Sequence, residues 1–405
     1  MHERVLEYAK LVIQSGVRLK KGQTLVIRCP VECASFAHLV AEEGYRAGAR
    51  EVVVLWGDDV LNRLRYMYAD DEVFDTVPLW FTNFYEEFVN GKAALVSIAA
   101  SDPEGLKGAP PDRVRRNTIA TGTAIKKYTS MISSCALPWC TVSVPTTAWA
   151  KKVFPETANP VDKLWDAIFQ AVRVSGDGTS PQKWQEHVAF LLNRVKMLND
   201  YHFARIIFKN SLGTNLCIEL PDKHLWVGGQ QKTPSGAAFI ANMPTEEIST
   251  MPHKYGVNGV VYSSMPLSLS GNLVKDIKLT LKDGKIVDEY AKEGLEFLQT
   301  ALNADEGARY LGEVALVPHK STISEQGILY YNTLFDENAS CHLAFGRAYP
   351  TLKGANEMTE AELRENGVND SIVHVDFMIG TPDLSVIGVM EDGEEIPVFV
   401  NGNFA

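Results

Sequence analysis

The segment Thr24-Leu-Val-Ile-Arg-Cys29 is the first of several short apolar runs that decide the fold of this 405-residue chain. Its aliphatic and β-branched residues predict a buried strand. A helical pattern from about Ser35 to Ala47 follows, ends at Gly48, and leads into a second strand, Glu51-Val-Val-Val-Leu-Trp56. A strand, a helix and another strand in this order are typical of a βαβ unit on a parallel sheet.

The same alternation continues on both sides of this unit. A helical pattern over Val5–Ile13 precedes it, further strands are predicted at Ala93–Ala100 and Cys140–Pro145, and residues 160–202 have a helical pattern. We therefore expect an α/β N-terminal domain with a mostly parallel sheet over residues 1–200. No Gly-x-Gly-x-x-Gly follows these strands, so the sequence offers no support for dinucleotide binding.

Beyond residue 200 the pattern changes to β. The strand candidates are Ala204–Lys209, Asn215–Leu220, Gly259–Tyr262 and Lys278–Lys282. Asp283-Gly284 and Asp392-Gly393 each lie between alternating segments, and this dipeptide favours a tight hairpin turn. We expect a β-rich α+β C-terminal domain over residues 201–405, which carries the catalytic site proposed below.

Composition and charge exclude several classes of protein. The chain is 45% hydrophobic and 22% charged, as in ordinary globular proteins, and its net charge of -11 argues against nucleic acid as a partner. The six cysteines lack paired zinc-site spacing and are expected to be reduced. The N-terminus does not resemble a secretory signal, and no apolar run is long enough to span a bilayer. A cytoplasmic protein with no membrane partner is expected.

Polar residues interrupt the apolar segments of the second half. Ser371–Gly380 reads as a strand broken by His374 and Asp376, which share one face because they are two residues apart. Burying them side by side is costly unless a partner such as a metal ion pairs with them. Other polar intrusions of this kind are Glu247, Glu313, Glu337 and His342. Together these residues supply the four carboxylates and two imidazoles that two divalent cations would need.

Each of these residues alone allows a plainer interpretation. His374 and Asp376 could form a hydrogen-bonded core pair, and Glu313 could face solvent. The Pro-Thr-Glu-Glu string that ends at Glu247 favours a helix N-terminus. Glu337 and His342 share neither a helix face nor a strand face, so they could meet only through a turn.

The set as a whole favours metal binding more than its members do. Four carboxylates balance the charge of two divalent ions, and two imidazoles and a bridging hydroxide complete the coordination. Oxygen and nitrogen ligands without thiolate suit catalytic Zn, Co, Mn or Mg. From these residues alone, a two-metal hydrolase is a candidate function. His253 and His319, each after a proline, are candidates for supporting or pocket residues.

Four strings resemble the thermophilic-type metalloaminopeptidases, the group of aminopeptidases T and S, and the likeness spans essentially the whole chain. They are Asn242-Met-Pro-Thr-Glu-Glu247, Gly312-Glu-Val-Ala-Leu-Val317, Tyr331-Asn-Thr-Leu-Phe-Asp-Glu-Asn-Ala-Ser-Cys-His342 and His374-Val-Asp376. The resemblance implies a homodimeric exopeptidase that removes N-terminal residues from short peptides, using two divalent ions and a bridging hydroxide.

The resemblance also implies roles for individual residues. By similarity, the metal ligands would be Glu247, Glu313, Glu337, His342, His374 and Asp376. Glu313 would be the bridging carboxylate. Tyr349 matches the family's catalytic tyrosine, whose phenol could stabilise an oxyanion; without the family it would be an ordinary half-buried aromatic residue.

Three other functions remain open at this point. One is another two-metal hydrolase, an amidohydrolase or phosphoesterase, although only Arg347 supplies a basic group close to the ligands in sequence. A noncatalytic metal-stabilised binding module is the second. The third is a small-molecule binder that uses the first domain.

Overall fold

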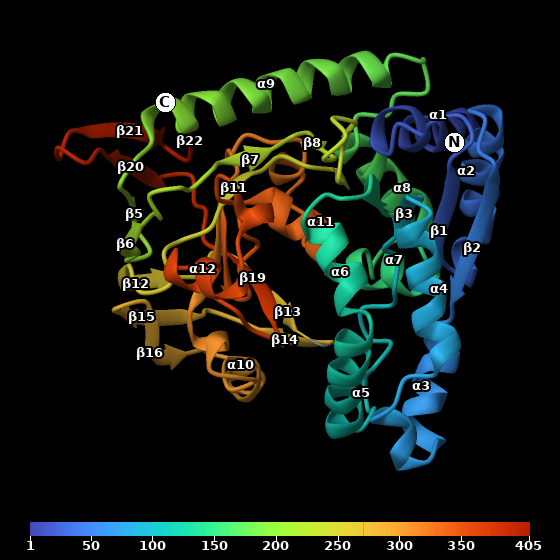
Figure 1. Cartoon of the computed structure of the whole chain (residues 1–405), viewed down its shortest axis with the longest axis horizontal. Helices are drawn as coiled ribbons and strands as arrows, with labels where there is room; N and C mark the ends of the chain where they lie inside the picture. The colour runs from blue at the N-terminus through green and yellow to red at the C-terminus, as the bar shows by residue number, and fades with distance from the viewer. Residues whose placement is uncertain (270) are drawn as a thin grey trace. The chain divides into compact units, whose positions relative to one another are not determined.

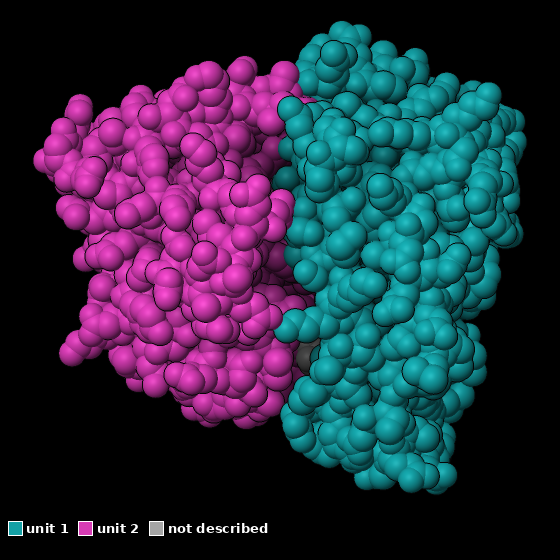
Figure 2. Space-filling model, viewed as in Figure 1, with its two compact units in different colours: residues 1–187, 230–244 teal, residues 188–229, 245–405 magenta. Residues whose placement is uncertain are grey.

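The computed structural model describes residues 1–269 and 271–405 (Figure 1). Their contacts divide the chain into two units, residues 1–187 with 230–244 and residues 188–229 with 245–405 (Figure 2). The change of unit thus falls within helix α9 (Ser180–Tyr201), and a short later segment returns to the first unit. The division at residue 200 that the sequence suggests stays a prediction.

A five-stranded parallel sheet forms the first unit, with strand order β10-β4-β3-β1-β2. Its strands are β1 (Thr24–Pro30), β2 (Glu51–Gly57), β3 (Ala94–Ile98), β4 (Trp139–Val142) and β10 (Asn242–Met243). Leu25, Val26 and Ile27 of β1 are buried, as expected for a strand covered on both faces. The α/β prediction with a mostly parallel sheet is confirmed.

Helices surround this sheet, some of them (near residues 5–13, 35–47 and 160–202) where the pattern predicts a helix and the others where it does not. They are α1 (His2–Leu11), α2 (Ala34–Arg46), α3 (Asp59–Tyr68), α4 (Leu79–Asn90), α5 (Pro111–Ala124), α6 (Lys126–Ser133), α7 (Thr147–Val153) and α8 (Pro160–Ala171). The rings of Tyr8 and Phe36 join α1 to α2, with centroids 5.2 Å apart, and both side chains are buried. This contact anchors the first helix beside the βαβ unit. A small hairpin of β8 (Gln231–Lys232) and β9 (Ala238–Phe239) completes the unit.

The second unit is built from antiparallel sheets. An eight-stranded sheet has the order β16-β15-β12-β6-β5-β20-β21-β22, and a five-stranded sheet has the order β19-β18-β17-β11-β7. The first contains β5 (Arg205–Lys209), β6 (Asn215–Glu219), β12 (Val257–Tyr262), β15 (Lys278–Lys282), β16 (Lys285–Tyr290), β20 (Ser385–Val389), β21 (Glu395–Val400) and β22 (Asn403–Phe404). The second contains β7 (Val227–Gly228), β11 (Ile248–Thr250), β17 (Leu311–Leu316), β18 (His342–Gly346) and β19 (His374–Met378).

Shorter elements complete the second unit. They are the hairpin of β13 (Leu267–Leu269) and β14 (Asn272–Val274) and the helices α10 (Leu295–Leu302), α11 (Thr333–Asp336) and α12 (Glu360–Glu365). Asp283 and Gly284 form the tight turn between β15 and β16, both with positive φ, and the Asp392-Gly393 dipeptide lies between β20 and β21. The β-rich C-terminal domain is therefore confirmed.

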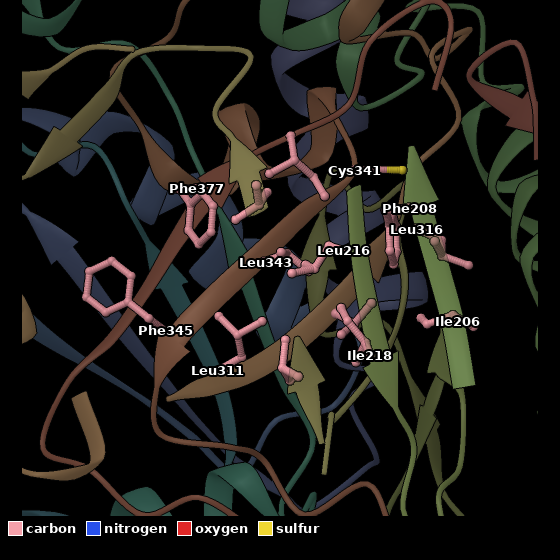
Figure 3. Packing of buried hydrophobic residues seen from close by; sticks show 14 of the residues in the cluster. Ile206, Phe208, Leu216, Ile218, Leu311, Leu316, Cys341, Leu343, Phe345 and Phe377 are labelled. Atoms are coloured by element: carbon pink, nitrogen blue, oxygen red, sulfur yellow. The ribbon is translucent and has the colours of Figure 1, made fainter. Parts of the chain in front are cut away.

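The core of the second unit lies between its two large sheets. Figure 3 shows Phe208 and Ile218 from the eight-stranded sheet in one cluster with Leu343, Phe345 and Phe377 from the five-stranded sheet. All five side chains are at most 1% exposed, so this contact is a closely packed sandwich. One face of the five-stranded sheet is therefore buried in the core.

Over residues 1–269 and 271–405, no helix combines the length and the apolar character that crossing a bilayer requires.

Candidate metal centre

Strand alternation separates apolar from polar side chains on β18 and β19. Leu343 and Phe377 enter the core, whereas His342, His374 and Asp376 belong to the opposite face. The predicted interruption of an apolar strand is therefore real. It marks the face of the sheet that is turned away from the core.

Small residues leave room between the polar side chains of neighbouring strands. Ala344 on the middle strand pairs with Glu313 on β17 and with Asp376 on β19. Directly paired residues point to the same side of an antiparallel sheet. Gly346 likewise pairs with His374, and a Cβ there would lie 2.2 Å from the Val373 oxygen. Glu313 and Asp376 thus flank a position that only a methyl group occupies.

Glu313, His374 and Asp376 form one compact group. Nε2 of His374 lies 3.2 Å from Oε2 of Glu313 and 3.4 Å from Oδ1 of Asp376. One potential ligand atom from each of the three residues lies within 4.8 Å of the others. Two carboxylates and an imidazole at such distances are a donor set that divalent cations bind.

Asp376 provides the observation that tests the fit of a cation. Its Oδ1 is buried and has no hydrogen bond of good geometry from the described residues; Nε2 of His374 lies 3.4 Å away. Burial alone would raise the pKa of this carboxyl, but His374 beside it lowers the pKa below its ordinary value. A buried anionic oxygen with no well-aligned hydrogen bond is costly, and a cation would satisfy it.

Glu247, Glu337 and His342 form a second group on the same face. Nε2 of the buried His342 lies 3.4 Å from Oε2 of Glu247, which directly precedes β11. Burial raises the pKa of Glu337 well above its ordinary value, and the charges of Glu247 and Asp376 raise it further. The 3-10 helix that carries Glu337 contacts β19, and the place of Glu337 among the ligands stays a prediction.

Both imidazoles are oriented by backbone carbonyls. Nδ1 of His374 lies 2.7 Å from the Arg347 oxygen, and Nδ1 of His342 lies 3.1 Å from the Ser340 oxygen. A carbonyl can only accept, so each Nδ1 carries the proton and each Nε2 faces the carboxylates. Such outer hydrogen bonds are typical of histidines that ligate metals.

Tyr349 lies at the edge of the first group. Its ring centroid is 4.9 Å from that of His374, and the residue is 42% exposed. Partial burial raises the pKa of the phenol; His374 lowers it, and Glu313 and Asp376 raise it. The phenol is therefore protonated at neutral pH and can donate a hydrogen bond beside the acidic cluster.

A model of the thermophilic metalloprotease (M29) family matches residues 1–404. The chain belongs to this family. The sequence-based prediction of a thermophilic-type metalloaminopeptidase is thereby confirmed, and this M29 enzyme is a hydrolase.

Individual relatives agree over the full length. Aminopeptidase 2 of Geobacillus stearothermophilus is 42% identical over 98% of this chain and 97% of its own. Aminopeptidase AmpS of Bacillus subtilis is 42% identical over 100% of this chain and 98% of its own. The solved structure of wild-type AmpT from Thermus thermophilus superposes with a TM-score of 0.91 at 38% identity, covering 100% of both chains.

Two of the plainer interpretations fail in this M29 chain. Residues 244–247 belong to no helix, so the predicted helix N-terminus at Glu247 is wrong; the chain instead enters β11 directly. The side chain of Glu313 is only 16% exposed, so it does not simply face solvent. The predicted turn between Glu337 and His342 is a 3-10 helix, Glu337–Ala339, followed by two residues that lead into β18.

The two additional histidines have contacts of their own. His253 packs beside Gly367 and Tyr255, and the His319 amide donates to the Gly402 oxygen. Their predicted supporting role stays a prediction. Sequence reasoning missed the buried Asn338, whose position directly after Glu337 was the available signal.

Metal binding is expected to release protons near neutral pH. Burial alone would lower the pKa of His342, but Glu247 raises it to about 10, so this imidazole is protonated in the metal-free protein. A cation binds the neutral imidazole, hence the proton must leave and metal affinity must rise with pH. Calorimetric titration in two buffers of different ionisation enthalpy measures the release. A binding enthalpy independent of the buffer would contradict it.

Proposed function

We propose that this metalloaminopeptidase uses a dinuclear metal centre to remove N-terminal residues from short peptides. The observation that carries the proposal is the pair of close contacts on this sheet, His374 with Glu313 and Asp376, and His342 with Glu247. The ligands in this proposal are Glu247, Glu313, Glu337, His342, His374 and Asp376. Two divalent ions, Zn, Co, Mn or Mg, would balance the four negative charges.

When bound, the ions supply an activated water or hydroxide as the nucleophile and polarise the bond under attack. Glu313 is proposed to bridge, and its charge supports this because it raises the pKa of Glu247 in one group and of His374 in the other. The Arg347 and Ser340 carbonyls hold the imidazoles in place. The chain therefore contributes a preorganised anionic frame.

Tyr349 is the proposed donor to the oxygen of the scissile carbonyl as negative charge develops there. Its exposed phenol lies beside His374 and keeps its proton at neutral pH. A donor aimed at a developing oxyanion stabilises the transition state more than the ground state. The acidic surroundings also attract the ammonium group of a peptide's free N-terminus.

One experiment separates an aminopeptidase from other metal-binding proteins. The protein is stripped of metal, restored with one metal at a time, and given an unblocked peptide and its N-acetylated counterpart. We expect release of the first residue from the unblocked peptide alone, and only with metal present. Equal cleavage of both peptides would rule out the aminopeptidase, and no cleavage with any metal would favour a noncatalytic binding module.

A phosphoesterase or amidohydrolase is less favoured. Phosphate sites commonly add clustered basic side chains, whereas Nε of Arg347 already donates to the Ser371 oxygen at 2.8 Å. The identity of the relatives supports peptides as substrates.

A cytoplasmic homodimer remains part of the proposal. Light scattering of the purified protein tests the assembly, and a monomer at assay concentration would contradict it.

A further inference from the structure

Asn338 is a fully buried amide next to a proposed ligand. It follows Glu337 directly and is 0% exposed. Its Oδ1 accepts a hydrogen bond from the Glu246 amide at 2.7 Å, and its Nδ2 donates to the Leu334 oxygen at 2.9 Å. Nδ2 also lies 3.4 Å from Oε1 of Glu337. One side chain therefore contacts both segments that carry Glu247 and Glu337.

Side chains contribute to holding the segment before Glu247. Residues 245–247 form no helix or strand, and the Glu246 amide reaches across 92 residues of sequence to Asn338. The Glu246 carboxylate in turn accepts a hydrogen bond from Oγ1 of Thr322 at 3.1 Å. Asn338 thus gives a side-chain anchor to a segment that lies outside the strand ladder.

The other group of ligands does not need this support. Glu313 lies within β17, and His374 and Asp376 lie within β19, where each strand pairs with β18. Their backbone positions follow from the strand register. Loss of the Asn338 amide should therefore disturb one half of the centre and spare the other.

We propose that Asn338 is a positioning residue that holds Glu247 against Glu337 and so sets the affinity of one of the two metal ions. This inference rests on the proposed dinuclear centre. Hydrogen-bond partners outside the ligand shell commonly fix ligand geometry, and their loss weakens metal binding by about 10–100-fold.

The test is a titration of metal-free protein with Co²⁺ alone, followed by visible absorption and by bound cobalt after desalting. Asn338→Ala removes every contact of the amide. Asn338→Asp keeps the shape of the side chain and the acceptor for the Glu246 amide. It replaces the Nδ2 donor by an oxygen, which then faces two acceptors, the Leu334 oxygen and Oε1 of Glu337. For both variants we expect one dissociation constant to rise by about 10–100-fold while the other is unchanged. If Asn338→Ala fails to fold, the nearly isosteric Asn338→Asp still decides.

Asn210→Ala is the matched control. Its amide also links two backbone segments of the same unit, accepting from the Thr214 amide and donating to the Ile379 oxygen. Both ions should bind this variant as they bind the wild type. Wild-type protein that binds fewer than two Co²⁺ would contradict the dinuclear centre itself. Two ions in the wild type, with unchanged or equally weakened binding of both in the Asn338 variants, would overturn the role of Asn338.

Discussion

Glu313→Gln is expected to abolish turnover. Removal of a hydrogen-bond partner outside the ligand shell lowers activity by up to about 100-fold. The loss of kcat/KM in Glu313→Gln should be larger, because the substitution neutralises a metal ligand itself. Oε2 of Glu313 lies 3.2 Å from Nε2 of His374, and the same charge raises the pKa of Glu247. Asp376 also contacts His374 and raises the pKa of Glu247, but it lies on the outer strand β19, whereas Glu313 lies on β17 directly beside β11.

The fold should survive this substitution. Glutamine has the shape of glutamate, and its introduction removes one negative charge from a half-buried acidic cluster. We therefore expect the metal-free variant to unfold in urea at the same concentration as the wild type, or at a higher one. Activity, bound metal and urea unfolding are measured on the same preparation.

Glu289→Gln is the matched control for the loss of a shielded carboxylate. Glu289 accepts hydrogen bonds from Arg309, with an Nη1–Oε2 distance of 3.0 Å, and this pair lowers the pKa of Glu289. The control should lose some stability at neutral pH, where the carboxylate is ionised, and should keep its activity. If Glu313→Gln retained wild-type kcat/KM, Glu313 would not be a ligand.

Much of the fold could be predicted because its signals are local. Continuous apolar runs such as Thr24–Cys29 predict buried parallel strands, and the Asp283-Gly284 dipeptide predicts the turn that β15 and β16 form. β10 could not be predicted in this way. Its two residues pair with β4 from about a hundred positions later in the chain, so only tertiary contacts define it.

The candidate site likewise has a part that local sequence patterns predict and a part that they do not. His374 and Asp376 are visible as a pair because strand alternation is a property of neighbouring residues. Their approach to Glu313 depends on the order of three strands, with Ala344 between them, and no local pattern encodes that order. Glu247 is open to a helix-capping interpretation because no local pattern shows that the chain enters β11 here, and the contact between its neighbour Glu246 and Asn338 spans 92 residues.

Tyr349→Phe is expected to slow turnover without removing metal. The substitution deletes one hydroxyl and keeps the ring that packs 4.9 Å from His374, so KM, bound metal and stability should stay close to wild type. Loss of one oxyanion donor typically lowers kcat by about 10²–10³-fold. Tyr255→Phe is the control, since Tyr255 is a comparably exposed tyrosine whose ring contacts Tyr310.

The pH dependence of kcat distinguishes a hydrogen-bond donor from a residue that only packs. Partial burial raises the pKa of the Tyr349 phenol, so the donor persists above the pH at which a free tyrosine ionises. Ionisation of Tyr349 should therefore not lower the wild-type kcat below about pH 10. The ratio of wild-type kcat to Tyr349→Phe kcat should fall toward one only above that pH. Equal kcat for the two proteins at neutral pH would show that the phenol has no part in stabilising the oxyanion.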